Sequence, residues 1–300
     1  MSTLLEEVRA SARAVAESAR FVRIRADRLA DYAASLPVEQ ARAPELDPLT
    51  HYLGEPDLTL GYLVTLDAIN FGSGYFPHLQ KRPGLSGYFT VAASLKDAWP
   101  LGVEELRRLS TEGCARIFGQ SDPGADIQEL MSLFARALND LADCVTHRYG
   151  GSFRELVRAA DGSAERLAEL LTEMTFYQDV GFYKRAQLTA ADLAVASVAS
   201  FDDLDRLTIF ADNLVPHVLR VDGVLEYETG LLERINREEL IQPGSTEERE
   251  IRACALHAVE LMRRHLDGVT AMQLDYVLWN RGQQPAYKAQ PRHRARTVFY

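Results

Sequence analysis

A carboxylate, two aromatic rings and a carboxamide are concentrated in one short stretch near the C-terminus, Leu274–Asn280. The remaining positions of this stretch are apolar, and on a helix Asp275 and Trp279 lie one turn apart on the same face. A carboxylate among aromatic side chains needs a partner, which is either another protein group or a bound ligand. The stretch therefore indicates either a buried structural aspartate or a catalytic carboxylate at position 275.

Two adjacent cations, Lys184 and Arg185, stand near the predicted start of another helix. Cations at a helix N-terminus oppose the helix dipole. A bound anion would resolve that conflict, because the exposed N–H groups and both cations would face the same place. The alternative is a lysine whose stem packs on apolar neighbours while its charged end reaches solvent.

A second candidate carboxylate, Asp212, falls within an apolar run in Leu204–Pro216, which reads as a helix that is interrupted before its proline. The face that carries Asp212 is expected to be partly buried. Its partner is either a nearby arginine or the N–H groups of a ligand, and both interpretations stay open.

The segment Tyr62–Pro77 is an apolar element that ends in a glycine-containing aromatic loop. Its two glycines are too few for a dinucleotide-binding fingerprint, and no regular βαβ pattern surrounds them. A tight turn beneath aromatic packing is the favoured interpretation. The functional alternative is a pocket wall in which Asn70 and Phe71 contact a planar ligand.

Histidines and other possible metal ligands give weaker signals. His51 lies in Pro37–Pro56, a segment rich in proline and turn residues, and a lone loop histidine is expected to face solvent. His257 and His265 are eight residues apart and are interpreted as structural or exposed. Because no cluster of ligand residues has convincing metal spacing, neither a metal nor a cofactor is predicted.

The elements that must position these residues are predicted to be mainly α-helical, because a 3.6-residue apolar period runs through most of the chain. Capping boxes are expected at Thr3-x-x-Glu6 and Ser245-x-x-Glu248, and Gly87–Ala93 is the best strand candidate. The expected helices contain the apolar series Leu4–Val15, Phe21–Tyr32, Leu106–Ile117, Leu130–Val145, Phe153–Val157, Leu167–Met174 and Ile251–Met262.

Composition limits the possible partners. The 300 residues carry a net charge of −10, which argues against a surface that grips long nucleic acid. From Arg281 onward, however, the chain has four arginines, one lysine and no acid. This tail is a solvated extension, binds nucleic acid, or docks back through Thr297–Tyr300.

The same composition predicts a soluble, cytoplasmic protein. The three cysteines are far apart and read as reduced core residues. The N-terminal residues carry acids instead of the apolar run of a signal peptide, and no stretch reaches the roughly 18 apolar residues of a membrane helix.

Several uncommon motifs, taken in order and spacing, resemble the queuosine salvage family of queuosine 5′-phosphate N-glycosylases/hydrolases. The resemblance runs from about His51 to Tyr300. The motifs are Asp67–Phe71, Phe182–Gln187, Phe210–Asp212, Leu274–Trp279 and His293–Arg296.

The resemblance implies one mostly helical domain over residues 1–300, distantly similar to helix-hairpin-helix DNA glycosylases, with about the first fifty residues less well covered. It implies hydrolysis of the bond between queuine, a 7-deazaguanine base, and ribose 5-phosphate. The expected partners are the small nucleotide queuosine 5′-monophosphate and its product queuine, with no stable nucleic-acid complex and no membrane.

The resemblance also implies roles for individual residues. Asp275 takes the position of the catalytic carboxylate, and Phe210 and Asp212 take base-binding positions. Lys184 and His51 fall where the family contacts its ligand.

The residue types suit this chemistry. Cleavage of an N-glycosidic bond develops positive charge on the sugar, which an anion such as Asp275 stabilises or attacks. A 7-deaza base lacks N7, the usual protonation site of a leaving purine, so more of the catalysis must act on the sugar. Asp212 can accept the two N–H donors of a guanine-type edge, and this pairing would reject an adenine-type edge.

The remaining candidates complete the expected site. Trp279 would stack on or enclose the base beside Phe210, and Arg185 would join Lys184 at the 5′-phosphate. Asn280 stands where animal relatives tend to have an acid, so this chain departs from the family pattern there.

Two other functions compete with this one. A DNA-repair glycosylase would need a basic duplex-binding face and a means of flipping a base, which the net charge disfavours. A non-catalytic queuine carrier would bind the base without cleaving any bond.

Overall fold

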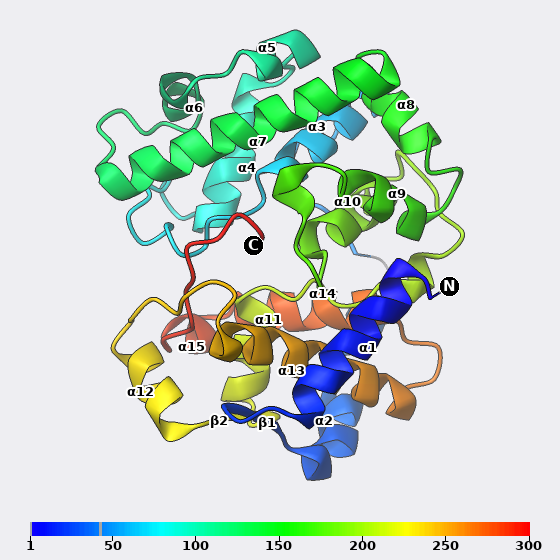
Figure 1. Cartoon of the computed structure of the whole chain (residues 1–300), viewed down its shortest axis with the longest axis vertical. Helices are drawn as coiled ribbons and strands as arrows, with labels where there is room; N and C mark the ends of the chain where they lie inside the picture. The colour runs from blue at the N-terminus through cyan, green and yellow to red at the C-terminus, as the bar shows by residue number, and fades with distance from the viewer. Residues whose placement is uncertain (1, 42–43) are drawn as a thin grey trace. The chain divides into compact units, whose positions relative to one another are not determined.

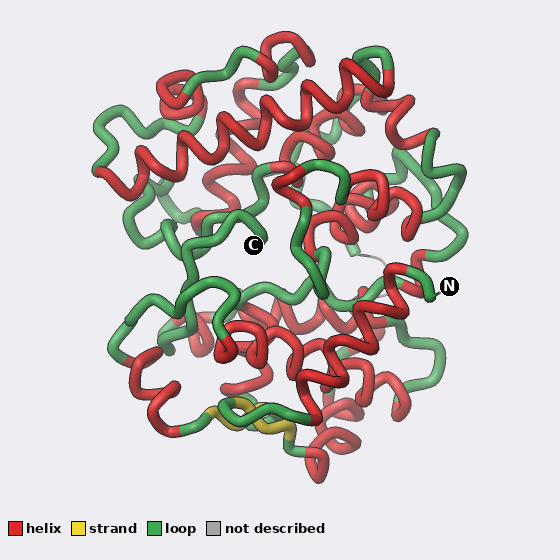
Figure 2. Tube along the Cα trace, viewed as in Figure 1, coloured by secondary structure: helices red, strands yellow, loops and turns green. Residues whose placement is uncertain are grey.

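The computed structural model describes residues 2–41 and 44–300 and is mainly α-helical, which confirms the predicted class (Figures 1 and 2). Within these residues the chain divides into two compact units. The first comprises Met1–Pro44, Val180–Lys184 and Asp203–Arg296, and the second comprises Glu45–Asp179, Arg185–Asp202 and Thr297–Tyr300. The expectation of one domain over the whole chain stays a prediction.

In the first unit, the helices pack around α13, which is buried on several faces. Helix α1 lies along α13 (Figure 1). The two predicted capping boxes correspond to helix starts, at Thr3 with a complete box and at Ser245 with a side-chain cap. The elements are α1 (Leu4–Glu17), β1 (Val22–Ile24), α2 (Leu29–Ser35), α11 (Leu214–Val221), β2 (Leu225–Tyr227), α12 (Thr229–Asn236), α13 (Thr246–Met262), α14 (Ala271–Gly282) and α15 (Pro285–Lys288), with 3₁₀ turns at Ala26–Arg28, Val38–Ala41, Leu204–Arg206 and Arg263–His265.

The helix expected at Phe21–Tyr32 is wrong in its first half. Val22–Ile24 forms strand β1, which pairs antiparallel with β2 (Figure 2). The Glu250 carboxylate of α13 accepts hydrogen bonds from the main-chain N–H groups of Arg20, Phe21 and Val22. Those N–H groups are thus satisfied by a distant carboxylate, and only Leu29–Ser35 continues as a helix, α2.

The helix expected over Leu204–Pro216 is also mostly wrong. Residues 207–213 are non-helical, and α11 begins only at Leu214. Pro216 lies in the first turn of α11, where a residue without an N–H group is tolerated. The non-helical segment that replaces the predicted helix carries both Phe210 and Asp212.

In the second unit, the long helix α7 packs against α3, α5, α6 and α8 (Figure 1). The rings of Phe71 and Phe118 each make an edge-to-face contact with Phe134, with centroids 5.2 Å apart. The elements are α3 (Pro56–Ala68), α4 (Gly87–Ala98), α5 (Val103–Arg107), α6 (Thr111–Ile117), α7 (Ala125–Tyr149), α8 (Phe153–Arg158), α9 (Ala164–Leu171) and α10 (Lys184–Val195), with a 3₁₀ turn at Thr175–Tyr177. The first residue of α10, Lys184, belongs to the first unit.

Two sequence expectations fail in this unit. The strand candidate Gly87–Ala93 is part of α4, which Ser86 caps by accepting the Phe89 N–H. A short, mostly buried apolar run has no periodicity that separates strand from helix. The single helix expected at Leu106–Ile117 is two helices, because Ser110 caps a new one, α6.

The C-terminal segment docks through its last residues, which is one of the three interpretations that the sequence leaves open. Tyr300 is buried, and its main-chain oxygen accepts a hydrogen bond from the Gly72 N–H at 3.0 Å. In the first unit, Arg294 approaches the Glu238 carboxylate at 3.5 Å. Part of the basic tail is therefore held against the protein and paired with an acid.

All three cysteines are free thiols. Within residues 2–41 and 44–300, none of the helices combines the length and apolar character that a membrane crossing requires.

Candidate active site

Helix α14 carries Asp275, as the sequence predicts. Thr270 and Gln273 form a capping box that fixes the start of the helix, and the apolar side of α14 packs into the core of the first unit. Asp275 lies one turn inside and is only 6% exposed. Its Oδ1 accepts the main-chain N–H of Phe210 at 2.9 Å. The segment Phe210–Asp212 is thereby joined directly to the candidate catalytic carboxylate.

Burial, and after it the nearby Asp212 carboxylate, raise the pKa of Asp275, which lies at about 7. The Phe210 N–H and the Lys184 ammonium act in the opposite direction and favour the carboxylate. Asp275, Asp212, Phe210 and Lys184 are therefore close enough to share one electrostatic environment. A buried acid that titrates near neutrality beside specific charges is typical of functional sites.

Asp212 is half-buried and caps α11. Its Oδ1 accepts the N–H groups of Leu214 at 2.7 Å and Val215 at 3.2 Å. Its Oδ2 receives no hydrogen bond from the residues that the structure describes. Burial lowers the pKa of Arg292, and the Asp212 carboxylate opposes this effect by favouring the charged guanidinium. One oxygen is thus structural, while the other is available to a ligand.

Arg252 is a site-organising residue that the sequence interpretation missed. Its Nε donates to the Ala211 carbonyl at 2.9 Å, between Phe210 and Asp212. Its guanidinium lies 3.9 Å from the centroid of the Phe182 ring, and it pairs with the equally buried Glu248 at 3.4 Å. A charged i,i+4 pair within the apolar stripe of α13 was the available sequence signal.

Other predicted residues of the first unit differ in exposure. Lys184 begins α10 and is 6% exposed, so it is not a lysine that reaches into solvent. Trp279 is half-buried against the core, one turn from Asp275. Asn280 is exposed, so the structure does not bring this side chain into the buried group around Asp275.

His51 belongs to the second unit, and its expected exposure is wrong because it is 2% exposed. Its Nε2 lies 2.9 Å from the Tyr88 hydroxyl, and its Nδ1 lies 3.1 Å from the Asp47 carbonyl. Burial lowers the pKa of His51, which favours a neutral ring. The sequence could not reveal this, because the contact with Tyr88 is made by a different element.

The turn expected after α3 is present, and it positions Asn70 and Phe71. Gly72 adopts a positive φ, and its carbonyl accepts the Tyr75 N–H at 2.8 Å. The half-buried Asn70 approaches the Asp67 carboxylate at 3.5 Å, whereas Phe71 is buried among aromatic rings. Phe71 thus packs in the core of the second unit.

Arg185 follows Lys184 directly but has different surroundings. It is fully buried in the second unit, where its Nη1 donates to the carbonyls of Asp67 and Ala68. Its Nη2 donates to the carbonyls of Phe176 and Val298. With both terminal nitrogens engaged by the main chain, the geometry favours an anchoring role over the predicted phosphate contact.

Known proteins resemble this chain along most of its length. A family model described as queuosine salvage protein matches residues 50–300. Relatives named queuosine 5′-phosphate N-glycosylase/hydrolase include one from Sphaerobacter thermophilus, 34% identical, with 96% of each chain covered. One from Mus musculus is 31% identical, covering 97% of this chain and 98% of its own. One from Dictyostelium discoideum is 30% identical, with 81% and 79% covered.

Proposed function

Because the chain belongs to the queuosine salvage family, we propose that it hydrolyses the N-glycosidic bond of queuosine 5′-monophosphate and releases queuine and ribose 5-phosphate. The observation that carries the proposal is the buried Asp275 carboxyl, whose pKa is about 7, in a chain that matches the named hydrolases over nearly its full length. We further propose that the released queuine is salvaged for tRNA modification and that the reaction takes place in the cytoplasm.

Asp275 is the proposed catalytic carboxylate. In its ionised form it would stabilise the positive charge that develops at C1′ of the ribose, or attack that carbon. The Phe210 N–H holds one oxygen in place, and the Lys184 charge favours ionisation. Low exposure strengthens the attraction between this carboxylate and a sugar cation, because little water screens it.

Asp212 and Phe210 are the proposed base-binding residues. The N1–H and N2–H donors of a guanine-type edge can both donate to carboxylate oxygens, and the Oδ2 of Asp212 is available for one of them. Its Oδ1 retains a further lone pair beside the Leu214 and Val215 N–H groups. Phe210 and Trp279 would supply ring surface against the planar base.

Lys184 is the proposed phosphate contact. Its ammonium group is buried and lies close enough to Asp275 to affect its ionisation. A cation there would attract the 5′-phosphate and also balance the two carboxylates. His51, Asn70 and Phe71 stay predictions as ligand contacts, and Asn280 and Arg185 have no part in the proposed chemistry.

A chromatographic assay tests the proposal. Queuosine 5′-monophosphate, queuosine, guanosine monophosphate, tRNA and duplex DNA are each incubated with the protein, and free base is measured. Release of queuine from the first substrate alone is expected, and Asp275→Asn should abolish it. Intact queuosine 5′-monophosphate after prolonged incubation would instead indicate a queuine carrier, and base release from duplex DNA would indicate a repair glycosylase.

A further inference from the structure

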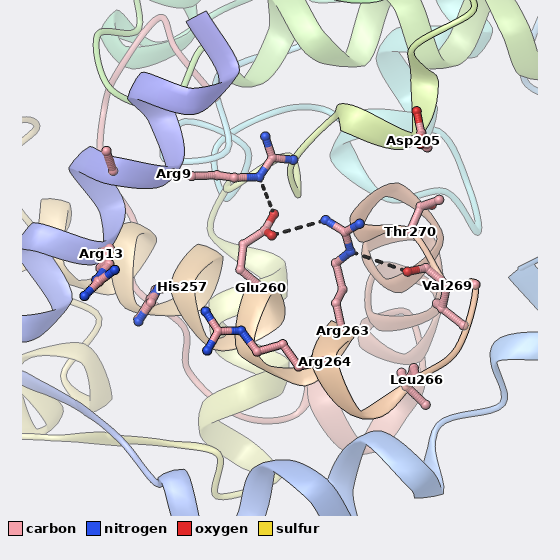
Figure 3. A pocket seen from close by; sticks show the side chains of 12 residues that line it. Arg9, Arg13, Asp205, His257, Glu260, Arg263, Arg264, Leu266, Val269 and Thr270 are labelled. Carbon is pink, nitrogen blue, oxygen red and sulfur yellow. Dashed lines mark hydrogen bonds and ion pairs between the residues drawn. The ribbon is translucent and has the colours of Figure 1, made fainter. Parts of the chain in front are cut away.

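An open hollow of about 690 Å³ lies in the first unit (Figure 3). It is lined by α1, the end of α13, the loop that precedes α14 and the 3₁₀ turns Leu204–Arg206 and Arg263–His265. Its charged lining residues are four arginines and two acids, which gives a formal charge of 4 − 2 = +2 with the histidine neutral. The whole chain, in contrast, carries −10. The charged and titratable residues are Arg9, Arg13, Asp205, His257, Glu260, Arg263 and Arg264.

Glu260 fixes two of these arginines. Its carboxylate lies 3.2 Å from the Nε of Arg9 and 3.2 Å from the Nη1 of Arg263 (Figure 3). Arg263 also donates from Nε to the Val269 carbonyl at 3.4 Å, in the loop before α14. One carboxylate is therefore shared between two guanidinium groups, which leaves it little capacity to neutralise further cations.

The other two arginines flank His257. Figure 3 shows the side chains of Arg13, His257 and Arg264 in a row along the hollow, and both arginines disfavour the charged form of the histidine. Among the residues that the structure describes, Arg264 has no ion-pair partner and the His257 ring has no hydrogen bond. Arg13 pairs with Glu17 at 2.7 Å, but both side chains are largely exposed, so this pair is weak.

We propose that Arg13, His257 and Arg264 bind a small phosphate-class dianion, either inorganic phosphate or the phosphate end of a phosphomonoester, at a site distinct from that of Asp275. Two planar guanidinium groups can each donate two hydrogen bonds to phosphate oxygens. The His257 ring can supply another donor from the same wall. The bound anion would attract both Arg13 and Arg264 and so offset the repulsion between these two positive charges.

Protonation of His257 is linked to this binding. Burial is the main cause that lowers the pKa of His257, and Arg13 and Arg264 lower it further, while Glu17 and Glu260 oppose them. A bound dianion adds negative charge beside the ring and must raise that pKa. By thermodynamic linkage, the dianion should bind more tightly to the protein in which His257 is protonated than to the protein in which this ring is neutral.

The experiment is a titration of inorganic phosphate into the full-length protein, read from the ring-proton NMR signals of His257. The signals are assigned with His257→Gln. A saturable shift and a rise in the pKa of His257 are expected. The double variant Arg13→Ala/Arg264→Ala should weaken binding at least about tenfold, because two charge-assisted contacts are lost. Arg237→Ala is the matched control, since Arg237 is exposed and pairs with Glu239.

Two further arms complete the test. Ribose 5-phosphate identifies the source: tighter binding than inorganic phosphate indicates a phosphomonoester, and equal binding indicates free phosphate. Lys184→Met should leave the His257 response unchanged, which separates this hollow from the proposed active site. Absence of a saturable shift, the same shift with chloride at equal ionic strength, or undiminished binding by the double variant would overturn the proposal.

Discussion

Two carboxylates of the first unit, Asp222 and Asp275, have opposite surroundings. Asp222 accepts three hydrogen bonds, from the hydroxyls of Tyr32 and Tyr287 at 2.6 Å each and from the Nε of Arg281 at 2.8 Å. Asp275 accepts one from the protein main chain and faces a second carboxylate. Asp222 thus connects α2, α14 and α15 through hydrogen bonds, whereas the charge of Asp275 is poorly compensated.

The difference indicates what each carboxylate contributes. Arg281 and Asp275 belong to the same helix, α14, so the Asp222 network fixes the element that carries the proposed catalytic group. Burial of a poorly compensated carboxylate costs stability, and such a cost is common at active sites. We infer that Asp222 stabilises the fold. The environment of Asp275 costs stability, and we infer that it serves catalysis instead.

The largest expected effect is that of Asp275→Asn. We expect activity to fall at least about 10³-fold, because the amide cannot stabilise a sugar cation. The melting temperature at neutral pH should be unchanged or higher, since the buried charge is removed. Queuine release and thermal unfolding are measured on the same preparation. A variant that loses stability but keeps its activity would reverse the assignment.

Asp222→Ala should have the opposite profile. Removal of the carboxylate leaves Arg281 and the Tyr32 and Tyr287 hydroxyls without their shared acceptor, and we expect a loss of about 3 kcal/mol in the free energy of unfolding. Chemical denaturation measures that loss. Asp222→Asn is the control, because it keeps hydrogen-bond acceptance and should lose less. If both variants unfold like the wild type, the network has no anchoring role.

Asp212 has a structural role at the start of α11 and a proposed role in base binding, and two substitutions separate these roles. Asp212→Ala removes the cap of α11, which should cost about 1 kcal/mol, and also the base contact. Asp212→Asn keeps the Oδ1 acceptor but removes the charge that raises the pKa of Asp275. That pKa should fall, so the loss of activity on acidification should move to lower pH. An unchanged KM in both variants would exclude Asp212 from base binding.

Lys184→Met should change the pKa of Asp275 less than Asp212→Asn does. The two changes should have opposite signs. Lys184 lowers that pKa, so its removal raises it, and the loss of activity on acidification should begin at higher pH. The variant should also lose its preference for queuosine 5′-monophosphate over queuosine. The pH dependence of kcat/KM with both substrates measures both effects. A retained preference would rule out Lys184 as the phosphate contact.

Local patterns predicted much of the first unit. The helix around Asp275, the helix start at Lys184 and the caps at Thr3 and Ser245 depend on residues within a few positions of one another. Local patterns could not predict the strand Val22–Ile24, because its partners, β2 and Glu250, are about 200 residues away in the sequence. Tertiary contacts of this kind override local helix preference.

The candidate site shows the same limit. The sequence and its family resemblance predict Asp275, Asp212, Phe210 and Lys184 as site residues. In the structure, the Phe210 N–H donates to Asp275, and the charges of Asp212 and Lys184 both act on its carboxyl group. Arg185 is predicted at the same site as Lys184 because the two are adjacent, yet its terminal nitrogens donate to four main-chain carbonyls. Sequence spacing identifies a cation but does not show which acceptors the fold will bring to it.

The pH dependence of kcat/KM for queuosine 5′-monophosphate tests the central claim most directly. Asp275 must be ionised to act, and its pKa is raised to about 7. Below that pH the folded protein holds a neutral acid, so the rate should rise with pH and reach half its maximum near pH 7 on the acidic side. A rate that stays constant down to about pH 5, where an ordinary aspartate is still ionised, would contradict the account.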